Sequence, residues 1–318
     1  MLINFNLNKC ANVYSIENSI FKHPDLRGID FIDSYLKLSE KLDLDFTEII
    51  NVLKHIPIPF HSDEHKKSRS EMFSLYLSNK DKKDNMKKYI ENQINSFLIN
   101  GKRNVLEDFI NPLIKEQIYQ LIGIKLVAEV DRFLDIFNIH MGIKRRKALN
   151  SDISKLRMEL ETKLPSLSKS DIYKKIGLIL FATESTRGFI GCGLHSIFKS
   201  GYSNNIDEIT KIIPNNIIIK KYFRTPKCPF EYEGIKYSDK QIMIFDYGNQ
   251  DFETRKKRLK LFGIDKHTCI GRDLALGIWQ SVTSELLNQK TKFIQIIDYD
   301  LLKSDLFVYP TKFTIRVH

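Results

Sequence analysis

The stretch that decides the fold reads Leu261-Phe262-Gly263-Ile264-Asp265-Lys266-His267-Thr268-Cys269-Ile270-Gly271-Arg272-Asp273-Leu274-Ala275. Gly263 and Asp265 are residue types that favour a tight turn. Apolar residues then recur at helical spacing, so we expect a helix to begin near Gly271. Cys269 therefore stands just before a helix N-terminus, where free backbone N–H groups and the helix dipole favour a thiolate.

A thiolate at this place suits a flat, metal-containing ligand. Gly271 has no side chain, so such a ligand could approach the backbone two residues after Cys269. Cysteine thiolate is one of the protein ligands that hold heme iron. The residues alone thus indicate Cys269 as a heme ligand, and the alternative is a buried structural cysteine beside the start of a helix.

The same stretch resembles the Cys-ligand loop of the cytochrome P450 family, Phe-Gly-x-Gly-x-His-x-Cys-x-Gly-x-x-Leu-Ala. The matching positions are Phe262, Gly263, His267, Cys269, Gly271, Leu274 and Ala275. Asp265 stands where the family has its second glycine. The resemblance implies heme b (iron protoporphyrin IX) as cofactor, with Cys269 as the metal ligand. Phe262, His267 and Gly271 would then be cofactor-binding residues.

Length and composition limit the architecture. The chain has 318 residues, 42% of them hydrophobic, and we find no internal repeat, low-complexity tract or linker. We therefore expect a single domain, 1–318. The resemblance implies a mainly α fold with small β-sheets, truncated at the N-terminus and in the helical pocket roof. Without a signal peptide or a membrane-spanning run, a cytoplasmic location is expected, and four scattered cysteines do not form a disulfide framework.

The formal net charge of +11 is spread along the chain, and no nucleic-acid-binding motif accompanies it. Lys256, Lys257, Arg258 and Lys260 form a basic run just before the Cys269 loop. This run is a candidate patch for an acidic redox partner, and a solvated surface run is the simpler interpretation.

A second pair of candidates lies near the start of the chain. His65 and Arg69 are four residues apart, so they share one face of the helix predicted after Pro59 and could clamp an anion. The pair resembles the family's His-x-x-x-Arg helix, which holds a heme propionate. Arg224 falls where the family has a further propionate-binding arginine. The alternative for His65 and Arg69 is an exposed, charged helix face.

The longest predicted helix opens at Ser168 or Ser170 and ends near Ser200. Its apolar centre contains Glu184, which is costly to bury without a partner or a task. The segment resembles the family's central helix, with Ala182, Glu184 and Ser185 on the positions of a small residue, an acid and a threonine. That implies Ala182 against the heme and a catalytic, proton-delivering role for Glu184, Ser185 and Thr186. The alternative is a polar notch in a packed helix.

Several other elements follow from periodicity and turn chemistry. Helices are expected over 30–54, 86–121, 125–163 and 271–287, strands over 217–223 and 242–245, and a closing β-hairpin in the tail. Residues 232–235 resemble the hairpin turn of the family's small sheet. By the resemblance, Glu208 and Lys211 correspond to a Glu-x-x-Arg brace of the Cys loop, with lysine in place of arginine and Arg255 as a candidate partner of Glu208. Asn249 and Asp251 resemble the Asn-x-Asp that follows the family's sheet.

The resemblance implies a soluble, bacterial-type monooxygenase that acts on a small molecule in bacterial secondary metabolism, with dioxygen activated at a Cys-ligated heme. Electrons would come from a ferredoxin or reductase, because the chain carries no flavin or iron–sulfur motif of its own. Two alternatives stay open. One is a heme-thiolate enzyme without an electron-transfer partner, such as a peroxygenase, isomerase or dehydratase, and the other is a non-catalytic heme-binding or sensor protein.

Overall fold

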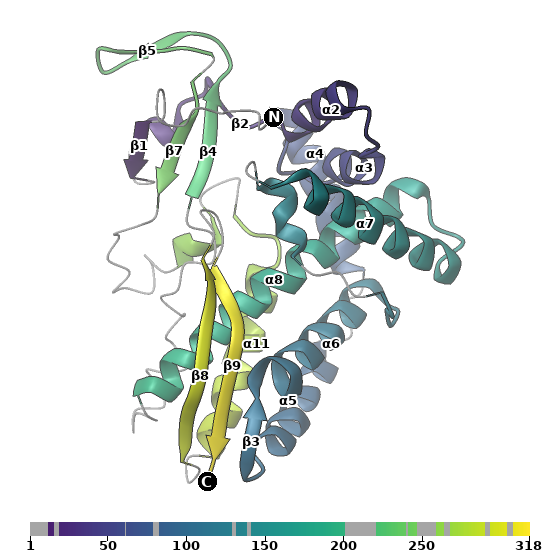
Figure 1. The fold of residues 1–318 in the computed structure, drawn as a ribbon, viewed down its shortest axis with the longest axis vertical. Coiled ribbons are helices and arrows are strands. Elements are labelled where there is room, and N and C mark those ends of the chain that lie inside the picture. The colour runs from purple at the N-terminus through teal and green to yellow at the C-terminus, as the bar shows by residue number, and fades with distance from the viewer. Residues whose placement is uncertain are drawn as a thin grey trace.

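The computed structural model describes residues 12–15, 19–60, 62–78, 83–128, 132–138, 141–200, 221–239, 241–246, 259–263, 268–289, 293–303 and 308–318. Within these ranges the chain is mainly helical, with small sheets at its edges (Figure 1). The longer helices are α2 (Phe31–Leu42), α3 (Thr47–His55), α4 (Ser62–Leu77), α5 (Lys83–Phe97), α6 (Asn111–Ile122), α7 (Ile143–Lys163), α8 (Lys169–Ser200) and α11 (Arg272–Asn288). Short helical segments are η1 (Ser19–Lys22), the π-helix η3 (Leu106–Ile110), η4 (Phe133–Phe137) and η5 (Lys260–Phe262).

Helix α8 crosses the molecule obliquely, and the other helices pack around it (Figure 1). Ser168 caps its start, because the Ser168 hydroxyl accepts the N–H of Asp171 at 3.1 Å. Two glycines let neighbours approach closely: a Cβ on Gly177 would lie 2.5 Å from Ile56, and one on Gly191 would lie 2.6 Å from Pro310. The sequence of α8 therefore specifies where the end of α3 and the strand of Pro310 contact it.

Two apolar cores lie along α8. The first core contains buried residues of α2, α3, α7, η4 and the N-terminal half of α8. The second core contains buried residues of α5, α6, α11 and the C-terminal half of α8. A polar link ties the first group together: Glu48 of α3 pairs with Arg157 of α7 at 3.0 Å and accepts the phenol of Tyr173 of α8 at 2.8 Å. Helices α2, α3 and α7 thus form a cover over one end of α8.

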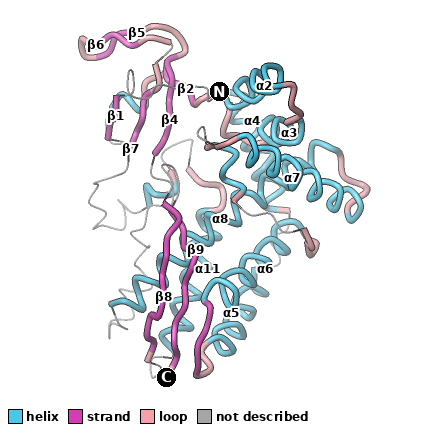
Figure 2. Tube along the Cα trace, in the orientation of Figure 1, coloured by secondary structure: helices cyan, strands magenta, loops and turns pink. Residues whose placement is uncertain are grey.

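The sheets lie beside the helices (Figure 2). Strands β1 (Asn12–Ser15), β2 (Leu26–Gly28), β4 (Lys221–Pro226) and β7 (Met243–Asp246) form a sheet in the order β1-β7-β4-β2, in which β1 runs parallel to β7. Strands β3 (Gly101–Asn104), β9 (Val308–Val317) and β8 (Ile294–Lys303) form a second sheet in that order. Strands β5 (Phe230–Tyr232) and β6 (Ile235–Tyr237) form a hairpin. Glu233 and Gly234 both have positive φ, as a tight primed turn requires.

The mainly helical fold with small sheets is confirmed, as are the helices at 169–200 and 272–288 and the hairpin turn. The continuous helix expected over 86–121 is wrong, because Gly101 takes a φ of 131° and β3 pairs with β9 before η3 begins. The helix expected from residue 125 starts only at Ile143, after η4. The chain does close on an antiparallel pair, β8 with β9, but residues 308–317 form a single strand of that pair and not both of its arms.

Candidate functional site

Cys269 lies in a short loop that joins η5 to α11. Its N–H donates to the carbonyl of Phe262 at 2.6 Å, and the N–H of Ala275 donates to the carbonyl of Gly271 at 2.9 Å as α11 begins. Gly263 has a φ of 88°, a left-handed conformation that favours glycine. The backbone therefore fixes the position of Cys269 between a turn that needs glycine and the helix capped by Gly271.

The thiol of Cys269 is influenced by burial and by positive groups. Although the residue keeps solvent-exposed surface, the surrounding protein desolvates the thiol, which raises its pKa above the ordinary value. The N–H groups of Gly271 and Arg272 and the charges of Arg69 and Arg272 oppose this rise without cancelling it. The helix N-terminus thus lowers the pKa of the thiol, as predicted. The net shift of that pKa is nevertheless upward, because the effect of burial is larger.

One face of α4 lies toward Cys269. His65, Arg69, Met72 and Tyr76 follow each other at helical spacing, and His65, Met72 and Tyr76 are buried. Burial lowers the pKa of half-buried Arg69, and the charge of Cys269 partly offsets that effect. Burial, Asp273 and Cys269 together raise the pKa of Tyr76. The structure therefore brings Arg69 and Cys269 together, and His65 does not belong to an exposed helix face.

The polar centre of α8 is buried. Ala182, Glu184 and Thr186 are buried, and Ser185 is partly so. The Ser185 hydroxyl donates to the carbonyl of Phe181, one turn earlier in the helix. Thr183 does the same to Ile179 at 2.8 Å. Both hydroxyls thus donate to a carbonyl of their own helix, as serine and threonine in mid-helix often do.

Glu184 is held from outside its own helix. Only 1% of the residue is exposed, and its Oε2 accepts the N–H of Leu134 in η4 at 2.9 Å. Asp135, also buried, pairs with Arg132 at 3.1 Å and with Arg145 at 3.2 Å, which fixes η4. The carboxylate of Glu184 is therefore anchored to a segment about 50 residues away in sequence.

Two arginines of α7, Arg145 and Arg146, are part of this anchor. Arg145 also donates to the carbonyl of Arg132 at 3.2 Å. Arg146 donates to the carbonyls of Met141 and Asn138 at 2.9 and 3.2 Å. Each acceptor lies 5 to 13 residues before its donor, so these bonds tie the start of α7 to the segment that leads into it from η4.

Apolar contacts join the three segments of the site. Buried Ala182 of α8 and Met72 of α4 belong to the same cluster as Ile270 and Leu274, which flank the start of α11. Phe262 packs edge-on against Phe189 of α8, with ring centroids 5.4 Å apart. The structure thus assembles α4, α8 and the Cys269 loop around one place.

Arg224 lies on β4, opposite Gly28 of β2 and Met243 of β7. Its guanidinium stands 5.0 Å above the ring of Phe21, a cation–π contact. His267 lies outside the described residues, as do Glu208, Lys211, Asn249, Asp251, Arg255 and residues 256–258 of the basic run.

Sequence reasoning missed two residues beside the thiol. Arg272 begins α11 and Tyr76 lies seven residues after Arg69, which places it on the same helix face. The spacing from Arg69 could have identified Tyr76, and the position after Gly271 could have identified Arg272.

The residues present fit a heme-thiolate centre. A cysteine that receives N–H groups and two positive charges is suited to act as an anionic metal ligand. A Cβ on Gly271 would meet no atom within 4 Å, so a flat ligand has room beside the loop. In the described part of the chain no group of three or more His, Cys, Asp or Glu side chains could hold a metal ion instead.

Comparisons with known proteins give the fold. No protein-family model matches the chain, and no curated protein matches it in sequence. Among solved structures, P450BioI in complex with an acyl carrier protein ligated to hexadec-9Z-enoic acid has a TM-score of 0.71 at 12% identity, over 86% of this chain and 84% of that one. Cytochrome P450-153 from Novosphingobium aromaticivorans has a TM-score of 0.71 at 11% identity, over 87% of this chain and 81% of that one.

A third similar structure is PksS, a cytochrome P450 of the bacillaene polyketide synthase of Bacillus subtilis 168. Its TM-score is 0.68 at 14% identity, over 91% of this chain and 89% of that one. The protein therefore has the fold of the heme-thiolate monooxygenases. The fold is a divergent version of the cytochrome P450 fold. None of the described helices is long and apolar enough to cross a membrane.

Proposed function

We propose that the protein is a heme-thiolate oxidoreductase of the monooxygenase type that acts on a small molecule. The observation that carries this proposal is the environment of Cys269, whose sulfur receives the N–H groups at the start of α11 beside the guanidinium of Arg69. That arrangement lies in a P450-like fold, and α4 and α8 border it as they would border a bound heme.

Residues of four segments would hold heme b. Cys269 would ligate the iron, and Phe262, Ala182 and Gly271 would border the ring. His65, Arg69, Arg224 and His267 would bind the propionates, since paired cations suit carboxylates. A thiolate-ligated heme, when bound, supplies the activation of dioxygen for oxidation of a substrate.

Glu184 would accept and donate protons during the reaction. Its carboxylate is buried and anchored by Leu134, so it keeps one orientation while it takes up and releases a proton. Ser185 and Thr186 follow it on α8 and would carry the proton onward through their hydroxyls. Burial in the first core would keep bulk water away from this route.

A second candidate keeps the heme but not the electron supply: a peroxygenase, isomerase or dehydratase. One observation favours it, because the Ser185 hydroxyl is committed to the carbonyl of Phe181 rather than directed away from its helix. A non-catalytic heme sensor would use the same cofactor-binding residues without Glu184.

The proposed partners follow from the fold and the charge. A chain with a net charge of +11 suits an acidic ferredoxin or reductase as electron donor. One similar structure holds an acyl carrier protein, and another is a cytochrome P450 of a polyketide synthase. A small-molecule substrate of bacterial secondary metabolism is therefore part of the proposal.

Heme reconstitution tests the proposal. The reduced protein treated with carbon monoxide should show the red-shifted Soret band of thiolate-ligated heme. Cys269→Ala should abolish that band, while Cys228→Ala, at an exposed cysteine, should leave it unchanged. An identical spectrum in all three proteins would overturn the proposal. Turnover with a ferredoxin system against turnover with peroxide then separates the two enzymatic candidates.

A further inference from the structure

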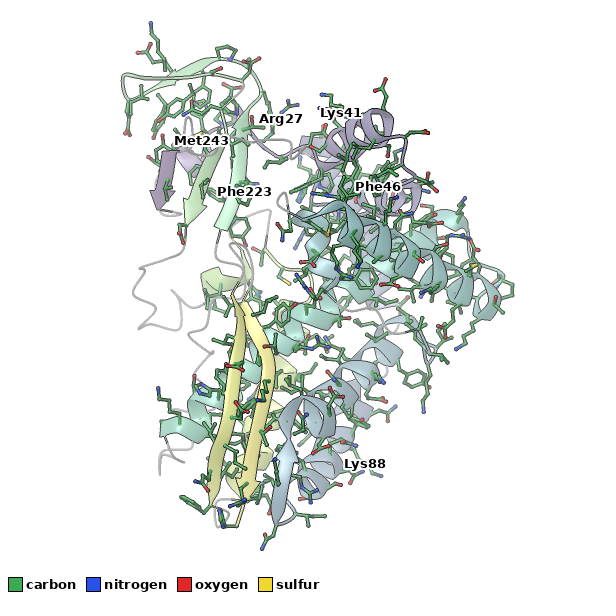
Figure 3. All side chains as sticks on the ribbon, in the orientation of Figure 1. Arg27, Lys41, Phe46, Lys88, Phe223 and Met243 are labelled. Atoms are coloured by element: carbon green, nitrogen blue, oxygen red, sulfur yellow. The ribbon has the colours of Figure 1, made fainter. Side chains whose placement is uncertain are left out.

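A groove of about 360 Å³ opens where β2, the start of α2 and the start of α4 meet. It is lined by Arg27, Asp30, Ile32, Asp33, Leu36, Pro59, Phe60 and Glu64. Figure 3 labels Arg27 at this junction between the small sheet and the helices. None of the lining residues belongs to the Cys269 loop or to α8, so the groove is a separate feature of the molecule.

Arg27 provides a donor without an acceptor. Its backbone is fixed on β2 opposite Thr225 of β4. Its Nε atom is buried and has no hydrogen-bond partner among the described residues. A guanidinium has only donors, and leaving one desolvated and unbonded costs free energy. An acceptor in the groove would remove that cost, and a carboxylate is the group that matches a guanidinium best.

The opposite charge is also present. Asp33 is neutralised by Lys37 at 2.6 Å, and Asp30 accepts the N–H of Asp33 through its Oδ1. Glu64, in the first turn of α4, has no ion-pair partner among the described residues. The groove therefore presents a carboxylate at Glu64, with Asp30 beside it, as well as the cation of Arg27. This combination suits a ligand with both an ammonium and a carboxylate group.

The remaining lining is apolar. Ile32 and Leu36 lie one turn apart on α2, and 48% of Leu36 is exposed. Pro59 and Phe60 supply the facing surface from the segment before α4. A volume near the lower end of the range for small-molecule sites excludes a bulky ligand. An aliphatic or aromatic side chain would bury apolar surface here.

We propose that this groove is a binding site for a zwitterionic α-amino acid with an apolar side chain. The ligand carboxylate pairs with Arg27, its ammonium pairs with Glu64 and Asp30, and its side chain packs on Leu36 and Phe60. Neither an anion nor a cation alone satisfies both charges, and an uncharged apolar molecule leaves Arg27 without an acceptor. The proposal does not depend on the heme and would stand if Cys269 proved structural.

Calorimetric titration of the full-length protein tests it, with L-leucine and L-phenylalanine as probes. L-leucine methyl ester, which lacks the carboxylate charge, and N-acetyl-L-leucine, which lacks the ammonium, serve as the matched compounds. Each should bind at least about tenfold more weakly than L-leucine, because each loses one charged hydrogen-bonded contact. Saturable binding of L-leucine with this pattern supports the site.

Variants locate the binding. Arg27→Met and Glu64→Gln should each weaken L-leucine binding about tenfold or more. Lys41→Met and Glu40→Gln, at exposed positions of α2 outside the groove, should leave binding unchanged. If Arg27→Met does not fold, Arg27→Lys and the first-turn variant Glu64→Gln answer the same question. Absence of saturable binding, equal binding of the methyl ester, or binding unaffected by either groove variant would overturn the proposal.

Discussion

The N–H of Leu134 donates to Oε2 of Glu184 across 2.9 Å, and this bond joins a short 3₁₀ helix to the middle of the longest helix. Such a bond gives a buried carboxylate a fixed direction, since a desolvated charge is stable only with hydrogen-bond donors around it. The ion pairs of Asp135 with Arg132 and Arg145 hold the 3₁₀ helix in turn. The geometry of the proposed acid thus depends on Arg132, Asp135 and Arg145, which lie outside α8.

Asp135→Asn should lower the free energy of unfolding by about 1–3 kcal/mol, because Arg132 and Arg145 lose the buried carboxylate that they share. Urea unfolding measures the change. Asp152→Asn, in an i,i+3 pair with the exposed Lys155, is the matched control and should cost less than about 1 kcal/mol. Equal losses in the two variants would contradict an anchoring role for η4.

Glu184→Gln should fold normally but oxidise substrate poorly, because the amide oxygen still accepts the N–H of Leu134 while the titrating group is lost. Loss of a general acid lowers turnover by about a hundredfold or more. Product formed and peroxide released per electron, with and without deuterated solvent, give the measurement. Unchanged product yield and an unchanged solvent isotope effect would exclude Glu184 from proton delivery.

Tyr35→Phe should change how stability depends on pH. Burial raises the pKa of Tyr35 from 10.0 to about 12, so its contribution is complete below pH 10 and is lost as the pH rises toward 12. That shift corresponds to roughly 2–3 kcal/mol. The variant also loses the bond to the carbonyl of Ile136, about 1 kcal/mol. Wild type should be more stable at pH 8 and less stable near pH 12, and a constant difference would contradict this assignment.

Gly191→Ala should destabilise the protein, because the new Cβ would lie 2.6 Å from Pro310 and 3.3 Å from Ile110. Overpacking of this kind costs about 1–3 kcal/mol. Gly277→Ala is the matched control within α11, where nothing lies within 4 Å, and it should stabilise by about 0.5–1 kcal/mol. Thermal unfolding should therefore shift in opposite directions for the two glycines.

Arg69→Gln should weaken heme uptake about tenfold, because it removes a positive charge beside the Cys269 thiolate. Lys67→Gln, at an exposed position of the same helix, should take up hemin as wild type does. Absorbance titration with hemin gives the comparison. Should both variants bind hemin equally, α4 would not border the cofactor in the way proposed.

Local features were predictable from the sequence, because their physical cause lies within a few residues. The turn at Gly263, the start of α11 after Gly271 and the length of α8 each follow from glycine conformation, capping and helical period. The hairpin turn at Glu233 and Gly234, expected from the resemblance, has the same kind of local cause, since both residues have positive φ. These segments sufficed to indicate Cys269, since the sulfur and the N–H groups that face it are neighbours in the chain.

Features that depend on burial, or on contacts between distant segments, were decided only by the tertiary structure. It raised the pKa of Cys269 against the expected effect of the helix terminus, because desolvation depends on everything packed around the thiol. It broke the helix expected over 86–121, where pairing with β9 outweighs helical periodicity. It also turned Arg145 inward to Asp135 and brought Leu134 to Glu184. No short-range pattern encodes the contact between Leu134 and Glu184, which lie 50 positions apart. The surroundings of Cys269 were therefore determined locally, whereas the surroundings of Glu184 were determined only by the fold.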